Sequence, residues 1–398
     1  MADLENSPHP LVFRLARLDE EITRAESPRP PRVEIRTFAR ALAGMQKEAL
    51  ATSSPNGYTW RMACDEGPYL NGTDLAPFPL AFFTTGLVNS YFMEILDLAR
   101  LRGMTIGTLE LVQDNLYTME GSAVRGDMIG GALPVALHVR INADAADDTL
   151  RDLVAAAVIR SPADAFLRGV FASEFSIAKN GEPVPVGNVR HSSAPRDYDL
   201  SDAMFDAERP DPNADFPRDI ITKLAAAESL FGVEGGAGSS LRSEQKRTLH
   251  VRGIVALRAD GLTETRVQLF KPIGSNFRFL CDLEPLGGPR APSPLEYLSA
   301  GVAFCYLTQI GRYATILKHD LERYAIAQRT RFGFASGDGA GAMPASADAV
   351  RTHVEIATAA EDTTVRKIVD MGERTCFLHA AARTALETRV RIEVGGRG

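Results

Sequence analysis

The sequence contains two related segments, and this internal repeat constrains the fold more than any other feature. PFPLAFFTTGLVNSYF at residues 77–92 is matched by PSPLEYLSAGVAFCYL at residues 292–307, and we call this alignment the main register. It holds without a gap far downstream, where HVRI from residue 138 matches HVEI from residue 353. Chance does not keep one register over about a hundred residues. The sequence therefore predicts a tandem duplication of a unit of roughly 150 residues, an ordinary domain size.

Each copy has the pattern of an α+β domain. In the second copy, short runs of β-branched and aromatic residues at 249–259 and 264–270 predict strands. A long apolar segment at 294–318 predicts a helix, with proline in its first turn. A second helix is expected to begin near Asp362, and a final strand, TRVRIEV, closes the copy. Strands and helices in this order favour an α+β fold over a doubly wound parallel sheet.

We divide the chain into four parts on this pattern. Residues 1–32 form an N-terminal tail in which LVFRLARLDEEITRAE predicts an amphipathic helix, and residues 33–183 form the first domain. Residues 184–245 form a polar, proline-rich linker, with a predicted helix in FPRDIITKLAAAESLF and a flexible loop in GVEGGAGSS. That glycine run lacks the Gly-Lys-Ser/Thr ending of a phosphate-binding loop. Residues 246–398 form the second domain.

Composition excludes several classes of protein. The chain of 398 residues is 45% hydrophobic and 24% charged, with a formal net charge of −7. An acidic balance argues against a nucleic-acid partner. Apolar runs are too short for a membrane span, and the N-terminus does not have the layout of a secretory signal. With only four cysteines a disulfide scaffold is excluded. We therefore expect a cytoplasmic protein.

Two cysteines change together between the copies, and they are the main candidates for chemistry. The main register pairs Cys305 with Ser90 and Cys376 with Ser161. Independent core cysteines have no reason to change jointly, whereas two cysteines that work together do. A thiolate that attacks a peroxide becomes a sulfenic acid, and a second thiol condenses with it to a disulfide. The joint replacement therefore predicts a redox pair in the second copy and a retired site in the first.

A structural interpretation stays open, because free cysteine is among the most buried residue types. Upstream of the matched segments the alignment shifts, since the first copy has extra loop residues, and this upstream register pairs Cys64 with Cys281 in matching strands. This cysteine is present in both copies, although only the second copy has the predicted redox pair. We therefore assign Cys64 and Cys281 to the core. His138 and His353 also recur in both copies, and we assign them to strands. No cluster has metal-ligand spacing, so neither a metal nor a cofactor is predicted.

The second copy resembles the OsmC/Ohr family of peroxide-reducing thiol proteins. The matching pattern is a Pro-x-Pro loop, Pro292 to Pro294, that leads into a small-residue helix with Cys305, and a second cysteine, Cys376, about 70 residues later at a helix end. The passage CDLEPLGG resembles the family's acidic strand-to-loop segment. The resemblance implies an intertwined dimer with antiparallel sheets around central long helices. Because both copies carry the pattern, it implies an intramolecular pseudo-dimer of two OsmC-like domains.

The resemblance also implies an activity. Cys305 would attack an organic hydroperoxide, Cys376 would resolve the sulfenic acid, and an external dithiol would restore the thiols. A mostly apolar pocket between the halves would suit a lipid-like or aromatic peroxide. The alternative is a non-catalytic protein that binds a small molecule or senses redox state through the same cleft. The sequence leaves open whether two chains associate into a further homo-oligomer.

The residues that would activate the thiolate are less well defined. The family places a glutamate and an arginine beside the first cysteine, and the nearest acid here is Glu296, which Ala81 replaces in the first copy. A helix-start carboxylate favoured by the helix dipole explains Glu296 equally well. Arg312 lies two turns beyond the cysteine, and Arg278 recurs in the first copy, so neither is assigned. His379, one turn after Cys376, is interpreted as an ordinary helix histidine.

Overall fold

The protein is described from a computed structural model. The structure describes residues 3–15, 31–54, 57–194, 200–206, 208–212, 217–226, 236–283, 289–337 and 343–395.

Within the described residues the strands form two mainly antiparallel sheets of ten and eight strands, so the fold is α+β. The first follows the order β1 (Val12–Arg14), β4 (Thr59–Cys64), β3 (Lys47–Ser53), β2 (Arg32–Ala41), β15 (Arg323–Gly333), β17 (Arg351–Ala357), β8 (Glu174–Lys179) and β10 (Arg190–His191), with β16 (Ser346–Ala347) beside β15 and β9 (Glu182–Val184) beside β8. The second follows the order β11 (Ile221–Ala226), β14 (Ser275–Cys281), β13 (Thr263–Lys271), β12 (Glu244–Leu257), β5 (Ile106–Ser122), β7 (Val135–Ala143) and β18 (Thr388–Val394), with β6 (Ile129–Ala132) beside β5. The parallel pairs are β8 with β17, β8 with β10, and β7 with β18.

Each sheet takes strands from both halves of the chain. In the first sheet β2 pairs with β15, and in the second β12 pairs with β5, both antiparallel. The strands at these junctions alternate buried and exposed residues, as expected for sheets with one covered face. The backbone hydrogen bonds of either sheet therefore need both halves, and neither half completes a sheet alone.

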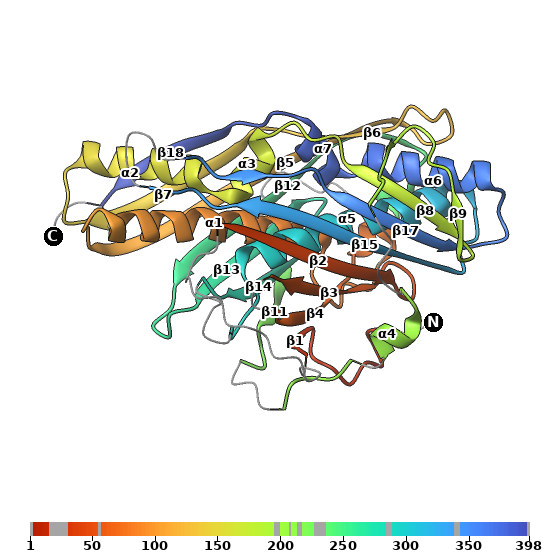
Figure 1. Ribbon diagram of the computed structural model, residues 1–398, viewed down its shortest axis with the longest axis horizontal. Coiled ribbons are helices and arrows are strands. Elements are labelled where there is room, and N and C mark those ends of the chain that lie inside the picture. The colour runs from red at the N-terminus through yellow and green to blue at the C-terminus, as the bar shows by residue number, and fades with distance from the viewer. Residues whose placement is uncertain are drawn as a thin grey trace.

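Two long helices, α1 (Pro79–Leu101) and α5 (Pro294–Leu317), pack against each other between the sheets (Figure 1). Nearly every residue of both is buried. They approach closely at two glycines that the main register relates: a Cβ on Gly86 would lie 2.6 Å from the Leu298 nitrogen, and a Cβ on Gly301 would lie 2.6 Å from the Phe83 nitrogen. Only glycine permits backbones this close.

Shorter helices cover the ends of the sheets. They are α2 (Asp147–Arg160), α3 (Pro162–Arg168), α6 (Asp362–Thr375) and α7 (Phe377–Arg383), and α2 and α6 lie toward opposite ends of the long axis in Figure 1. Under the main register, α6 and α7 correspond residue for residue to α2 and α3. Among the described residues, no helix combines the length and hydropathy that a membrane crossing requires.

Two helices predicted from local patterns are strands in the structure, in the parts that it describes. Residues 12–14 of the predicted N-terminal helix form β1, which pairs with β4, and residues 16–30 lie outside the described range. Residues 221–226 of the predicted linker helix form β11, which pairs with β14, and residues 227–235 lie outside the described range. Each strand covers an exposed sheet edge, whose unpaired backbone groups outweigh weak helical propensity.

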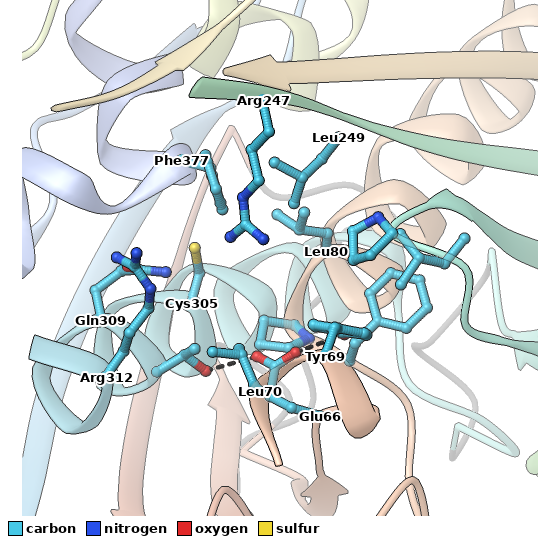
Figure 2. Close-up of a pocket in the computed structure, with 15 residues that line it drawn as sticks. Glu66, Tyr69, Leu70, Leu80, Arg247, Leu249, Cys305, Gln309, Arg312 and Phe377 are labelled. Carbon is cyan, nitrogen blue, oxygen red and sulfur yellow. Dashed lines mark hydrogen bonds between the residues drawn. The ribbon is translucent and has the colours of Figure 1, made fainter. Parts of the chain in front are cut away.

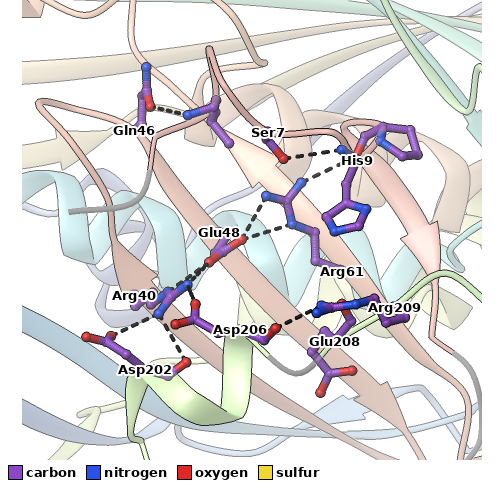
Figure 3. Close-up of polar contacts among 12 residues, drawn as sticks. Ser7, His9, Arg40, Gln46, Glu48, Arg61, Asp202, Asp206, Glu208 and Arg209 are labelled. Atoms are coloured by element: carbon purple, nitrogen blue, oxygen red, sulfur yellow. Dashed lines mark hydrogen bonds and ion pairs between the residues drawn. The ribbon is translucent and has the colours of Figure 1, made fainter.

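The linker is fastened to the first sheet by an ion cluster (Figure 3). Glu48 of β3 accepts from Arg40 and Arg61, each at 2.7 Å, and all three side chains are largely buried. Arg40 also contacts Asp202 at 2.9 Å and Asp206 at 2.7 Å, in the short helix α4 (Asp202–Asp206). The cluster thus joins α4 to the outer face of the sheet.

Candidate thiol site

Two cysteine sulfurs meet in the interior of the second half. Cys305 lies in the middle of α5, and Cys376 is the residue between α6 and α7, at the N-cap position of α7. Their Sγ atoms are 3.3 Å apart, in hydrogen-bonding contact, and both thiols are free. A disulfide needs about 2.05 Å between sulfurs, so a movement of about 1.3 Å would join them. The structure therefore brings the two sequence-predicted thiols together.

Only one of the two sulfurs faces open space. Cys305 is 2% exposed and lines a small cavity of about 30 Å³, whereas Cys376 is fully buried behind it. Figure 2 shows the Cys305 sulfur pointing into this cavity, with Phe377 and Leu249 beside it. The volume suffices for a water molecule or two, or for the end of a larger ligand.

The two thiols share their ionisation. Burial raises the pKa of Cys305, and the contact with Cys376 raises it further, while the backbone N–H groups of Phe377 and Leu378 act in the opposite sense. Burial also opposes ionisation of Cys376, but the contact with Cys305 and the neighbouring His379 bring its pKa well below the ordinary value. A first negative charge is thus favoured on Cys376, and a second on Cys305 is strongly opposed.

Two arginines line the same cavity. Arg247 of β12 hydrogen-bonds the Ser240 hydroxyl, and Arg312 of α5 donates to the Ser240 carbonyl oxygen at 2.7 Å. Within the described part of the chain neither guanidinium forms an ion pair with a carboxylate. Burial lowers the pKa of Arg247 to about 10, and burial with the charge of Arg247 lowers the pKa of Arg312 to about 9. Cations that lack a salt-bridge partner favour an anion in the cavity.

A carboxylate from the first half completes the polar side of the cavity. Glu66, in the loop after β4, accepts hydrogen bonds from the Tyr69 hydroxyl at 2.7 Å and from the Thr308 hydroxyl at 2.9 Å (Figure 2). Burial raises the pKa of Glu66. Because Thr308 lies on α5, one turn after Cys305, Glu66 connects the first half directly to the helix that carries the thiol.

Glu296, the acid predicted to lie near the thiol, has a different place. It forms a capping box with Ser293 at the start of α5: its carboxylate accepts from the Ser293 nitrogen at 2.7 Å, and the Ser293 hydroxyl accepts from the Glu296 nitrogen at 3.3 Å. Burial raises the pKa of Glu296 to about 7. It does not line the cavity at Cys305, and helix capping accounts for its position.

Arg247 and Glu66 were missed by the sequence analysis, although the repeat contained a signal for both. The strand pairings relate β2 to β12 by an offset of 216 residues, so Arg247 corresponds to Pro31; under the upstream register Glu66 corresponds to Leu283. Each is thus a charged residue in one copy and not in the other, much as the cysteines belong to one copy alone. Position alone could not identify them, because they belong to different halves and meet only across the interface.

The remaining candidates are structural or unassigned. Cys64 and Cys281 are buried at the ends of β4 and β14, and burial raises the pKa of both thiols well above the ordinary range. Arg278 pairs with Asp219 on the outer side of β14 and does not line the cavity. Across the described ranges no three His, Cys, Asp or Glu side chains are grouped as metal ligands would be.

Comparisons with known proteins give one family and one related structure to report. Residues 287–391 match the family model described as OsmC-like protein. An OsmC-like hydroperoxide resistance protein from Jannaschia sp. CCS1, known from its crystal structure, is 21% identical over 32% of this chain and 79% of its own, with a TM-score of 0.21. No curated protein sequence matches the chain.

Proposed function

Because residues 287–391 are an OsmC-like domain, we propose that the protein reduces organic hydroperoxides with the thiols of Cys305 and Cys376. The observation that carries this proposal is the 3.3 Å contact between the two sulfurs, one of which faces a cavity with two arginines. Neither a core role nor simple packing requires cations beside a thiol. A thiolate, in contrast, is stabilised by neighbouring positive charge.

The first step oxidises Cys305. A proton crosses from the Cys305 sulfur to Cys376, which leaves the thiolate on the sulfur that faces the cavity. The thiolate attacks the terminal oxygen of R–OOH, so that an S–O bond forms and the O–O bond breaks. The alkoxide takes from solvent a proton, equivalent to the one that Cys376 released when it ionised, and leaves as the alcohol, and Cys305 becomes a sulfenic acid. Arg247 and Arg312 favour the negative charge on the thiolate and on the leaving oxygen.

The second step forms the disulfide. The Cys376 sulfur attacks the Cys305 sulfenic sulfur, an S–S bond forms, and hydroxide leaves as water. An external dithiol then reduces the bridge and is itself oxidised to a disulfide. A reducing compartment such as the cytoplasm suits this cycle, because it supplies the dithiol.

The cavity wall supports a choice of substrate class. The lining divides into apolar side chains, Leu80, Leu249, Leu269 and Pro272, and polar ones, Arg247, Arg312 and Glu66. An alkyl or aryl hydroperoxide presents an apolar tail and a polar peroxide end, which this division matches. Since the open space is about 30 Å³, the apolar tail enters only when these side chains move.

We further propose that the chain is an intramolecular pseudo-dimer, with domains 33–183 and 246–398 joined by the linker. The two sheets have the same strand order with the halves exchanged: β4, β3, β2, β15, β17 and β8 of the first sheet correspond to β14, β13, β12, β5, β7 and β18 of the second. Equivalent glycines meet where α1 and α5 cross. The first half would then serve as partner, supplying Glu66 to the site of the second. Joining the two in one chain makes their association independent of concentration.

The test is a single turnover of the reduced protein with cumene hydroperoxide, followed by intact mass measurement. We expect the loss of two hydrogen atoms, mapped to Cys305 and Cys376, and repeated turnover when dithiothreitol is added. Cys305→Ser should abolish peroxide consumption, and Cys376→Ser should stop at a sulfenic acid. Cys64→Ser is the matched control and should turn over like the wild type. Thiols that stay reduced under excess peroxide would contradict the enzymatic proposal.

A redox-sensing role is the second candidate, because the contact between the two sulfurs would also serve a protein that forms the disulfide without turning over. A sensor would form the Cys305–Cys376 disulfide with peroxide but would show no sustained turnover with dithiols. The same experiment therefore separates the two roles.

A further inference from the structure

We propose that His379 is the base that takes the proton from Cys376 when this thiol resolves the Cys305 sulfenic acid; the inference rests on the function proposed above. The sequence analysis interpreted His379 as an ordinary helix histidine, and the cavity lining does not include it. Four structural observations point to this further role.

Helix geometry puts the imidazole next to the resolving sulfur. Cys376 is the N-cap of α7, and His379 is the third residue of that helix. N-cap and third-residue side chains face each other at a helix start, which is the arrangement of a capping box. In α3, the equivalent helix, the Ser161 hydroxyl accepts from the backbone nitrogen of Asp164 at 3.1 Å, so the N-cap side chain there lies over the third residue of the helix.

The imidazole is buried without a hydrogen bond. His379 is 1% exposed, and neither ring nitrogen has a hydrogen-bond partner within the described part of the chain. Its ring packs between aromatic neighbours, 5.1 Å from the Tyr306 ring and 5.5 Å from the Phe175 ring. Leaving a buried polar group unpaired destabilises the folded state, so such groups in native proteins call for an explanation.

The serine copy of the site has no such unpaired group. Asp164 is the counterpart of His379 under the main register. Its carboxylate accepts from the hydroxyls of Tyr91 and Thr388, each at 2.7 Å, and pairs with Arg168 at 2.7 Å. In the half with the serines, Asp164 therefore has hydrogen-bond and ion-pair partners. In the half with the cysteines, the equivalent residue His379 has no hydrogen-bond partner among the described residues.

The electrostatics of the pair agree with this assignment. Burial raises the pKa of the Cys376 thiol. The contact with Cys305 and the charge of His379 act in the opposite direction and hold this pKa below the ordinary value. The other titratable group packed on the ring is Tyr306, whose pKa burial raises well above the ordinary range, so that it stays neutral. Glu373 and Asp370 of α6 act on Tyr306.

Atoms and charges balance in this step. Cys376 S–H gives its proton to a ring nitrogen of His379, and the resulting thiolate attacks the sulfenic sulfur of Cys305. The S–S bond forms, the S–O bond breaks, and hydroxide leaves. Hydroxide takes up one proton to become water, and His379 releases the equivalent proton. The site then has no added charge, and the two cysteines have lost two electrons in forming the disulfide.

The first experiment follows the lifetime of the sulfenic acid. Reduced wild type, His379→Gln and His379→Asn are mixed with one equivalent of cumene hydroperoxide, and dimedone is added at intervals before mass measurement. We expect disulfide formation to slow at least tenfold, and by more than peroxide consumption slows, so that the dimedone adduct on Cys305 accumulates. Equal sulfenic acid lifetimes in the folded variants and the wild type would overturn the assignment.

A second experiment does not depend on peroxide chemistry. In Cys305→Ser, the Cys376 thiolate is titrated by its ultraviolet absorbance, with and without His379→Gln; Cys64 and Cys281 remain silent near neutral pH because burial raises their pKa values. We expect ionisation of Cys376 to shift to higher pH when the imidazole is removed. An unchanged titration would overturn the role of His379 even if peroxidase activity is absent, and a failure of wild-type turnover alone would contradict only the proposed function.

Discussion

The hydroxyl oxygens of Ser90 and Ser161 lie 2.8 Å apart in the first half, hydrogen-bonded to each other. They occupy the positions that correspond to Cys305 and Cys376, whose sulfurs are 3.3 Å apart. A helix centre and a helix junction hold each pair in the same way. The backbone therefore brings the two side chains into contact in both halves, and only the second half has thiols at these positions.

Restoring sulfur to the first half should restore bridge formation there. In a Cys305→Ser background, Ser90→Cys with Ser161→Cys should lose two hydrogen atoms on oxidation with diamide, because the two side chains are already in contact. Intact mass and peptide mapping give the readout. The single variant Ser90→Cys is the control and should not form this bridge. Two persistent free thiols in the folded double variant would show that the halves differ in backbone geometry.

Removing the cavity cations should slow the reaction with peroxide. Arg312→Met and Arg247→Met should each lower the single-turnover rate of peroxide consumption at least tenfold, since a thiolate and a leaving alkoxide lose their positive neighbours. Lys246→Met, at an exposed position next to Arg247 on β12, is the matched control and should keep the wild-type rate. Rates unaffected by both arginine changes would assign them to structure alone.

The capping carboxylate should make stability depend on pH. The pKa of Glu296 is raised to about 7 in the folded protein, so below pH 4 the carboxyl is protonated in both states. Between its unfolded pKa and about 7 the unfolded state releases the proton first, and folding stability falls as pH rises. By about pH 8 the loss reaches about 3 kcal/mol.

Glu296→Gln removes this titration and tests the prediction. The variant should gain stability relative to the wild type as pH rises from 4.5 to 8, measured by urea unfolding at each pH. The exposed helix-start acid Asp362 provides the control variant, Asp362→Asn, whose difference from the wild type should change much less. A Glu296→Gln difference that does not vary with pH would contradict a raised pKa.

The ion cluster on the first sheet should be sensitive to loss of its central carboxylate. Glu48→Gln leaves Arg40 and Arg61 as buried cations without their shared anion, and we expect a loss of about 3 kcal/mol in the free energy of unfolding. Asp206→Asn, which removes an exposed partner of Arg40, should cost less than about 1 kcal/mol. Similar effects of the two changes would show that burial of Glu48 does not govern the cluster.

Local patterns predicted the elements of the second half closely. The helix expected at residues 294–318 is α5, Pro294–Leu317, and the expected strand TRVRIEV is β18, Thr388–Val394. Local patterns succeed here because α5 is a long apolar run that begins at a proline, and β18 has β-branched residues at alternate positions. They failed for β1 and β11, whose conformation depends on the edges of β4 and β14, far away in the sequence.

What the sequence determined by itself is the repeat, the elements within each copy and the identity of the paired cysteines, because these follow from local composition and from comparing one copy with the other. The tertiary structure alone decided that Glu66 from one half and Arg247 from the other line one cavity with Cys305, and that His379 lies unpaired beside Cys376. The charges at this cavity come from residues of both halves, which are far apart in the sequence. Which of them become neighbours depends on how the two halves pack, and local sequence patterns do not contain that information.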